Sequence, residues 1–381
     1  MKKNGTTSKG TTRWRCINAS CGASTTRSTQ VATKNAATFR QFYNWITATT
    51  SLAAIAAQAG ITRQTLHQRF SWCWLIQPHP YIDPLRIYDQ VFIDGTYLNK
   101  QCLLIMSTVD HVIAWHWCTA ETTEAYTHLL RTIRPPLMVT LDGGQGAHSA
   151  ITKCWPTTKI QRCTVHAQRR IRQLTTSRPR TEAGKAIYGL ALALTKVEDR
   201  EQSAQWVVNL QETEQVFKPF LDEKTRYKPG QHPKGKLWEW THLRDRKALN
   251  SLKHLYRQGW LFAWLEPPDG FIGTPKSTTN SLEGGINSPL KLLARTHRGM
   301  SKEHQRTAID WWLVSKTQLP GDPVEIARQQ RWGQDALAKV TALTQPNENQ
   351  TNQETGRPAL YDNAIPTEYQ HNIGIRKGTI G

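Results

Sequence analysis

Three acidic side chains stand at points in the chain where a fold would hold them in place. Asp94 ends the apolar run Val-Phe-Ile, Asp142 ends the apolar run Leu-Met-Val-Thr-Leu, and Glu283 opens a helical segment. Such carboxylates could hold two divalent cations, which neutralise the charge of an attacked phosphate and activate its nucleophile. Without a cation the three would repel one another, and at least one would take up a proton. Their types therefore indicate phosphodiester chemistry.

Each acid also has an ordinary explanation when it is taken alone. Asp94 and Asp142 are each followed by glycine, a pair that suits tight turns for local reasons, and Glu283 could lie on a solvated helix face. The occurrence of all three in one chain favours the common role.

The segments around these acids predict strands and helices that would position them. A short strand over Val91–Ile93 ends at Asp94, and Gly95 lets the backbone turn. Further strands are predicted over 101–110, 111–120, 137–141 and 159–165, with helices over about 123–133 and from about 147. This order matches the ribonuclease-H-like fold, an α/β architecture. Its first and fourth strands are neighbours, so Asp94 and Asp142 would meet.

A basic segment divides the predicted core in two. The first part covers residues 86–175, an α-helical insertion covers 176–276, and the last part, with Glu283, covers 277–318. The loop over 224–236 has too few apolar residues to be packed. Residues 319–381 are predicted to form a polar tail, disordered from about 345.

Residues 36–80 have the apolar spacing of a helix-turn-helix, a DNA-binding motif. One helix is predicted from Leu52 to about Gln58, Gly60 supplies the turn, and Thr62 caps a second helix. Exposed residues at the start of that helix could contact base edges in a major groove; they are Arg63, Gln64, His67 and Gln68. An ordinary helical hairpin is the alternative.

The composition favours a nucleic-acid partner over a membrane. Lys and Arg number 49 and Asp and Glu 29, a formal net charge of +20, which indicates a polyanionic partner. No apolar run reaches the roughly 18 residues that span a bilayer, and the N-terminus lacks the apolar region of a signal peptide. Seven scattered cysteines argue against a disulfide framework, so we expect a reduced, cytoplasmic protein.

The N-terminal segment, residues 1–35, is basic and contains Cys16-Ile-Asn-Ala-Ser-Cys21-Gly22. Two cysteines followed by glycine are similar to one knuckle of a zinc ribbon, but structural zinc needs about four ligands. Either a first knuckle is missing ahead of this start, or Cys16 and Cys21 are free thiols. The second reading is favoured.

Taken together, these motifs resemble the DDE transposases of bacterial insertion sequences, and more narrowly the Mutator-like superfamily. FIDGT at Asp94, LDGGQGAH at Asp142, Cys163-x-x-His166 and TNSLEGG at Glu283 carry the resemblance, which covers roughly residues 86–318. In that family a Cys- or Asp-x-x-His pair follows the second acid, and a helical insertion precedes the glutamate. The long gap between Asp142 and Glu283 agrees with such an insertion.

The resemblance implies an enzyme that cleaves and joins DNA at the inverted repeats of an insertion sequence. Asp94 would bridge two Mg²⁺ or Mn²⁺ ions, Asp142 and Glu283 would each complete one site, and His166 would lie close by. Water would be the nucleophile for cleavage, and the freed 3′-hydroxyl for strand transfer. Pairing of two ends implies at least a homodimer on double-stranded DNA, associated with the bacterial nucleoid. For Cys163 and His166, a packed core pair and a zinc site are alternatives.

Two further groups of residues are candidates for contacts with DNA. The basic run 162–180 is predicted to follow phosphates, with Arg162, Arg169, Arg170 and Arg172. Among the tryptophans of the insertion, Trp238 and Trp240 are the candidates for stacking an unpaired base. Core packing is the ordinary role of such tryptophans.

Two other classes of protein fit part of the pattern. A DNA-binding regulator, or a domesticated transposase that binds without cutting, would share the helix-turn-helix and the charge. The intact trio of acids favours the enzyme, because a binding-only protein has no use for clustered carboxylates near DNA. A Holliday-junction nuclease on the same fold is disfavoured by the helix-turn-helix and the insertion.

Overall fold

A computed structural model describes residues 1–8, 10–26, 29–228, 230–232 and 234–339 of the chain. These residues form two compact units. The first contains Met1–Asn44, Leu52–Gln77 and the described residues from Gly321 onward, and the second contains Trp45–Ser51 and Pro78–Pro320. Within the described residues, no helix is both long enough and apolar enough to span a membrane.

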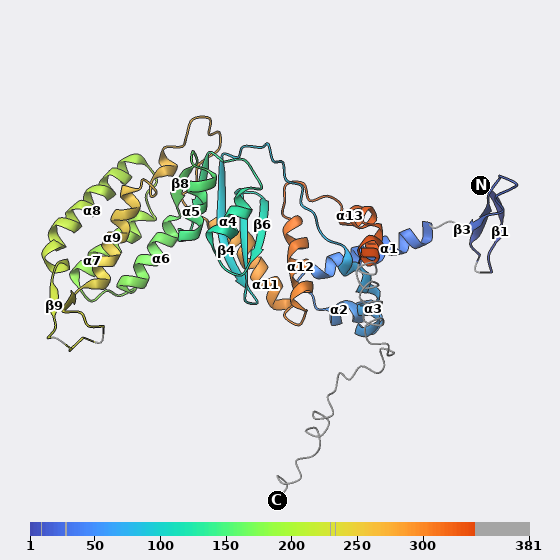
Figure 1. Ribbon diagram of the computed structural model, residues 1–381, viewed down its shortest axis with the longest axis horizontal. Coiled ribbons are helices and arrows are strands. Elements are labelled where there is room, and N and C mark those ends of the chain that lie inside the picture. Colours follow the sequence, from blue (N-terminus) through green and yellow to red (C-terminus); the bar gives the residue numbers. More distant parts are fainter. Residues whose placement is uncertain (9, 27–28, 229, 233, 340–381) are drawn as a thin grey trace, which may run out of the picture. The chain divides into compact units, whose positions relative to one another are not determined.

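A five-stranded mixed sheet is the centre of the second unit (Figure 1). Its order is β6-β5-β4-β7-β8, in which β4, β5 and β6 form antiparallel pairs, whereas β7 is parallel to β4 and β8 to β7. The strands are β4 (Gln90–Leu98), β5 (Gln101–Ser107), β6 (Val112–Cys118), β7 (Met138–Leu141) and β8 (Lys159–Arg162). The predicted strands therefore all exist, and the first and fourth are neighbours as expected.

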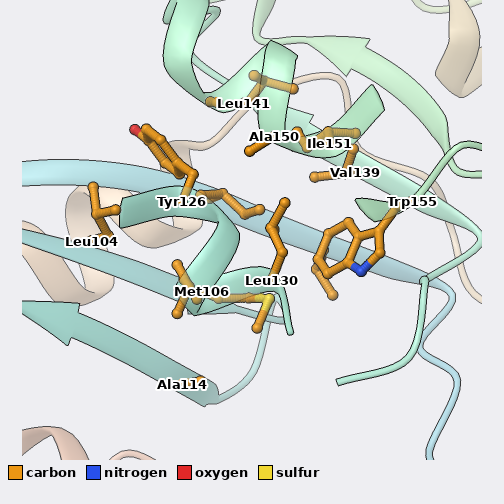
Figure 2. Close-up of a cluster of buried hydrophobic side chains, with 14 of the residues drawn as sticks. Leu104, Met106, Ala114, Tyr126, Leu130, Val139, Leu141, Ala150, Ile151 and Trp155 are labelled. Atoms are coloured by element: carbon orange, nitrogen blue, oxygen red, sulfur yellow. The ribbon is translucent and has the colours of Figure 1, made fainter. Parts of the chain in front are cut away.

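Helices cover both faces of this sheet, which explains why its strands are almost continuously apolar. On one face, α4 (Thr123–Leu130) and α5 (Gln145–Cys154) pack on side chains of β4, β5 and β7. Figure 2 shows this cluster, with Tyr126 among its aliphatic side chains. On the other face, α11 (Ser288–Thr296) and α12 (Lys302–Val314) pack on Phe92, Leu103 and Ile105.

Two predicted boundaries are wrong. The chain does not turn at Gly95: β4 continues to Leu98 because β5 pairs with it from Phe92 to Leu98. The turn comes at Asn99 and Lys100, whose φ angles are positive, 47° and 67°. The strand predicted over 159–165 ends at Arg162, and Cys163 is the N-cap of helix α6 (Thr164–Thr175).

The segment 176–276 is mainly helical, as predicted. Helices α7 (Glu182–Leu194), α8 (Arg200–Leu221) and α9 (Leu243–Arg257) pack with α6 around a separate apolar cluster. β9 (Lys224–Arg226) and β10 (Trp238–Trp240) pair as a small antiparallel hairpin. β9 lies at the start of the predicted loop 224–236, and β10 begins just after the end of that loop. The Arg162 backbone N–H donates to the Trp260 carbonyl at 2.7 Å, which connects this segment to the end of β8.

The first unit contains the two helices predicted as a helix-turn-helix. They are α2 (Leu52–Gln58) and α3 (Arg63–Phe70), joined through Gly60 at φ 63°. The Thr62 hydroxyl accepts a hydrogen bond from the Thr65 N–H at 3.1 Å, so the predicted N-cap is confirmed. Phe70 lies against Phe42 of α1 (Thr29–Ile46), and both rings are buried.

The ends of the chain add smaller elements to the first unit. Strands β1 (Lys2–Thr6), β2 (Thr12–Arg15) and β3 (Ser24–Thr26) form an antiparallel sheet, and Cys16 and Cys21 lie in its last connection. The residues of the expected polar tail that the structure describes contain α13 (Pro323–Gln329) and the turn η4 (Arg331–Gly333), and Trp332 contacts Trp72. The disorder predicted from about 345 lies outside the described residues.

Candidate functional site

Asp94 and Asp142 lie side by side because of the strand register. Ile93 of β4 pairs in parallel with Leu141 of β7, so the next residue of each strand is an aspartate at the same edge of the sheet. Asp94 is only 7% exposed, since β4 continues beyond it. Asp142 follows the last residue of β7, and its Oδ1 accepts a hydrogen bond from the Gly144 N–H at 3.2 Å.

Glu283 reaches the same site from a helix with an unusual turn. Residues Asn280–Leu282 (α10) lead into a π-helical turn, η3 (Glu283–Asn287), which continues as α11. Such π turns inside helices occur frequently at functional sites. Asn287, at the other end of the turn, donates from Nδ2 to Asp94 Oδ2 at 2.7 Å. This bond connects the helix of Glu283 directly to the central strand.

Two basic side chains of α6 hold the Glu283 carboxylate. His166 Nε2 lies 2.9 Å and Arg169 Nη1 2.8 Å from Glu283 Oε1. The other ring nitrogen of His166, Nδ1, lies 3.4 Å from the Thr279 hydroxyl, which also donates to the buried Cys163 Sγ at 3.4 Å. A hydrogen bond with Cys163 is the main cause of the raised pKa of His166, and the charges of Cys163 and Glu283 add to it. The Cys-x-x-His pair is therefore packed against the Glu283 segment and orients its carboxylate.

The site is short of positive charge around Asp94. Burial, followed by the charge of Asp142, raises the pKa of Asp94 to about 7; His166 opposes this rise and Glu283 adds to it. In the described part of the chain, no three His, Cys, Asp or Glu side chains stand close enough to hold one ion. Glu283 instead faces Arg169 and His166. A cation shared by all three acids would require Glu283 to turn away from Arg169.

The donor atoms nevertheless fit a hard divalent cation. All three acids offer carboxylate oxygens, the ligands that Mg²⁺ prefers. Asn287, 4% exposed, has a buried Oδ1 without a hydrogen-bond partner, next to the Asp94 carboxylate that its Nδ2 contacts. A buried acceptor of this kind is unfavourable unless something binds it. The raised pKa of Asp94 indicates the same shortage of a positive charge.

Glu121 is a fourth acid at this site, and sequence reasoning missed it. It precedes α4, and its Oε2 accepts a hydrogen bond from the Tyr126 hydroxyl at 2.8 Å. A Cβ atom added to Gly95 would lie 2.6 Å from Glu121 Cδ and 2.7 Å from its Oε1. Gly95 has no positive φ, so the absence of a side chain, and not a turn, explains this glycine. Nothing in the spacing around Glu121 indicates the contact.

The predicted phosphate-binding arginines are in different environments. Arg170 and Arg172 are exposed on α6, whereas Arg169 is engaged with Glu283. Arg162 lies at the end of β8 with its guanidinium directly over Gly143, and its Nη1 is buried without a hydrogen-bond partner. Arg162 lines a cavity of about 580 Å³ beside Asp142, together with His148, Arg170, His254 and Trp260. A buried, unsatisfied guanidinium group in such a cavity could bind an anion.

The remaining predicted residues belong to other elements of the chain. Trp238 and Trp240 of β10 contact each other edge to face at 5.1 Å between ring centroids, and Arg246 covers the Trp240 ring at 3.8 Å. Trp238 is 43% exposed. On α3, the four candidate base-contacting residues are all exposed; they are Arg63, Gln64, His67 and Gln68. The Cys16 and Cys21 thiols are free.

Comparison with known proteins gives one positive result. Residues 113–215 match the family model described as "Transposase, Mutator family". The match begins in β6, contains Asp142 and the Cys163–His166 pair, and ends in α8. No curated protein matches the chain. The resemblance to Mutator-family transposases is thus confirmed over these residues, and transposase activity is the function that the match indicates.

The charge shortage at Asp94 has a measurable effect on stability. A carboxyl group whose pKa is raised from 3.8 to about 7 by folding destabilises the folded state at high pH, and this cost shrinks as pH falls below 7. Asp94→Asn should therefore stabilise the metal-free protein at pH 8.5, by up to about 4 kcal/mol at 1.36 kcal/mol per pKa unit. Thermal unfolding in EDTA at pH 8.5 and pH 5.5 measures this gain, which should be smaller at pH 5.5. A gain independent of pH would contradict the prediction.

The contact between Gly95 and Glu121 predicts a specific pattern of stability. Gly95→Ala should destabilise the protein by about 1–3 kcal/mol, because the added methyl group overlaps the Glu121 carboxylate. In a Glu121→Ala background the same substitution should cost much less, since the space is then free. Chemical denaturation of the four proteins of this cycle measures the coupling. An equal cost in both backgrounds would show that Glu121 does not explain Gly95.

Proposed function

We propose that this protein is a transposase that binds the terminal inverted repeats of an insertion sequence and cleaves and transfers DNA strands by a two-metal DDE mechanism. The observation that carries the proposal is that Asp94 and Asp142 directly follow the paired residues Ile93 and Leu141 of neighbouring strands, while the helical turn of Glu283 is bonded to Asp94 through Asn287. The Mutator-family match over residues 113–215 supports the same reaction class.

The topology of the second unit supports a ribonuclease-H-like core. Three antiparallel strands are followed by two parallel ones, with helices on both faces. In open sheets of this type, ligands bind beyond the carboxyl ends of the strands where the order reverses. In this sheet β5 and β6 lie on one side of β4, whereas β7 and β8 lie on its other side. Asp94 and Asp142 lie where β4 and β7 meet, which is where the strand order reverses.

In this mechanism Asp94, Asp142 and Glu283 would hold two Mg²⁺ or Mn²⁺ ions, which would supply positive charge at the attacked phosphate and activate water or a 3′-hydroxyl. His166, itself held at Thr279, orients Glu283. Arg169 contacts the Glu283 carboxylate, and its guanidinium would be free to bind a phosphate if Glu283 turned toward the other acids. Arg162, whose Nη1 is buried, provides a second cationic group near Asp142.

DNA binding is assigned to exposed basic surfaces of both units. In the first unit, α2 and α3 act as a helix-turn-helix, with Arg63 and Gln64 at the exposed start of α3. In the second, Arg170 and Arg172 of α6 contact the DNA backbone. The exposed face of Trp238 is the remaining candidate for stacking an unpaired base. Pairing of two transposon ends makes a homodimer the smallest working assembly.

The main test is cleavage of DNA in the presence of Mg²⁺ or Mn²⁺. A plasmid carrying the gene with its flanking DNA serves as substrate, and strand breaks at the element ends are mapped by primer extension. Asp94→Asn, Asp142→Asn and Glu283→Gln should each reduce cleavage at least 10³-fold, roughly 4 kcal/mol of lost transition-state stabilisation. Glu124→Gln, at an exposed position of α4, is the matched control and should cleave normally.

The alternative, a regulator that binds DNA without cutting it, predicts a different outcome. Wild-type protein and the three acid variants would then bind the flanking DNA equally, and none would break it. Cleavage that survives Asp94→Asn would instead contradict the assignment of the acids.

The role of α3 predicts a separate loss of binding. Replacing Arg63 and Gln64 together by alanine should weaken binding to the element ends about tenfold or more, because each base contact contributes about 1–3 kcal/mol of discrimination. Binding to unrelated DNA should change much less. Fluorescence anisotropy at fixed salt measures both affinities, with Lys185→Ala on α7 as an exposed-cation control. Equal losses on both DNAs would exclude sequence readout by α3.

A further inference from the structure

Glu121 approaches the acid site from the opposite face of the sheet. Asp94 lies on the face of β4 that α11 and α12 cover, since Phe92 and Leu98, at alternate positions on the same face, pack there. Gly95 points to the other face, where α4 packs and where the Glu121 carboxylate lies against it. The Asp94 and Glu121 carboxylates therefore lie on opposite faces of β4, at the neighbouring strand positions 94 and 95.

The pairing between β4 and β7 ends just before the level of the acids. On its β7 side, β4 is paired only as far as Ile93, because β7 ends at Leu141. Beyond that residue, none of the described strands pairs with β4 on its β7 side. The position that a Cβ of Gly144 would take is 3.8 Å from Asp142 Oδ1 and 3.9 Å from Glu121 Oε2. The two carboxylates thus approach one backbone position from different sides.

The Glu121 carboxylate is held firmly but not neutralised. Tyr126, which donates the 2.8 Å hydrogen bond, is 1% exposed and belongs to the apolar cluster of Figure 2. None of the ion pairs among the described residues involves Glu121. Glycine at position 95 makes the space for the carboxylate.

A second observation indicates that a cation belongs at this site. Asn287 is 4% exposed and contacts Asp94 through Nδ2, yet its buried Oδ1 has no hydrogen-bond partner. An oxygen acceptor left unsatisfied beside an acid cluster suits a bound cation, which accepts carbonyl as well as carboxylate oxygens as ligands. This observation is independent of the carboxylates themselves.

We propose that Glu121 is a fourth carboxylate of the divalent-cation site, acting together with Asp142. This inference rests on the proposed function, because it assigns Glu121 to the cations that the DDE acids hold. Tyr126 fixes the carboxylate, and Gly95 and Gly144 lack the side chains that would obstruct it. With acids on both faces of β4, Glu121 and Asp142 would hold a cation even while Glu283 is bound to Arg169.

The test measures cation binding without DNA and without catalysis. Mn²⁺ is titrated into the full-length, metal-free protein, and free Mn²⁺ is followed by electron paramagnetic resonance. Glu121→Gln keeps the size of the side chain and an oxygen for Tyr126, and it should weaken Mn²⁺ binding about tenfold or more. Glu121→Asp retains the charge but shortens the side chain, and it should also weaken binding. Glu124→Gln, an exposed acid one turn away, should leave the affinity unchanged.

The outcomes separate this inference from the proposed function. If Asp142→Asn loses Mn²⁺ but Glu121→Gln and Glu121→Asp bind it as the wild type does, Glu121 is only a structural partner of Tyr126 and the inference is overturned. If the wild type itself binds no Mn²⁺ at millimolar concentration, the two-metal function and this inference both fail. Circular dichroism of each variant confirms that a loss of binding is not a loss of folding.

Discussion

The hydrogen bond between Asn287 and Asp94 is the contact on which the arrangement of the acids depends. It joins the central strand to a helix that the chain reaches only after β5–β8 and the whole helical segment of α6–α9. Asn287 and Glu283 stand at the two ends of one π-helical turn, so the bond at Asn287 fixes the approach of Glu283. The same bond is one of the contacts that stabilise a carboxylate buried beside Asp142 and Glu283.

Burying acids together is unfavourable, and the fold compensates for it with packing rather than with counter-charge. The sheet is covered on both faces by apolar clusters, one beneath Tyr126 and one beneath Leu282 and Ile286. These clusters hold the strand ends rigidly, so the acids cannot separate to relieve their repulsion. Of the three acids, only Glu283 forms ion pairs among the described residues, with His166 and Arg169 of α6, while Arg162 lies near Asp142 without an ion pair. A site of this kind stores unfavourable charge that a bound cation would relieve.

The sequence predicts the framework of the site well, because its signals are local. The apolar runs that end in Asp94 and Asp142 form β4 and β7, which pair with each other as expected. Thr62 caps α3, as its residue type predicts. The errors arise where a distant partner decides the local structure. Gly95 looked like a turn residue, but pairing with β5 keeps it in the strand, and the Glu121 carboxylate explains why no side chain is present. Asn287 and Arg162 gain their importance from residues far along the chain, Asp94 and Gly143, which no spacing rule connects to them.

The central claim is that the acids within β4, directly after β7 and on the π turn form a cation site. Crystals of the protein soaked in Mn²⁺ and measured at a wavelength where manganese scatters anomalously test this directly. The account predicts anomalous peaks in contact with Asp94 and Asp142, with Glu283 turned from Arg169 toward the metal. Crystals without such peaks at saturating Mn²⁺, with Glu283 still bound to Arg169 and His166, would contradict it.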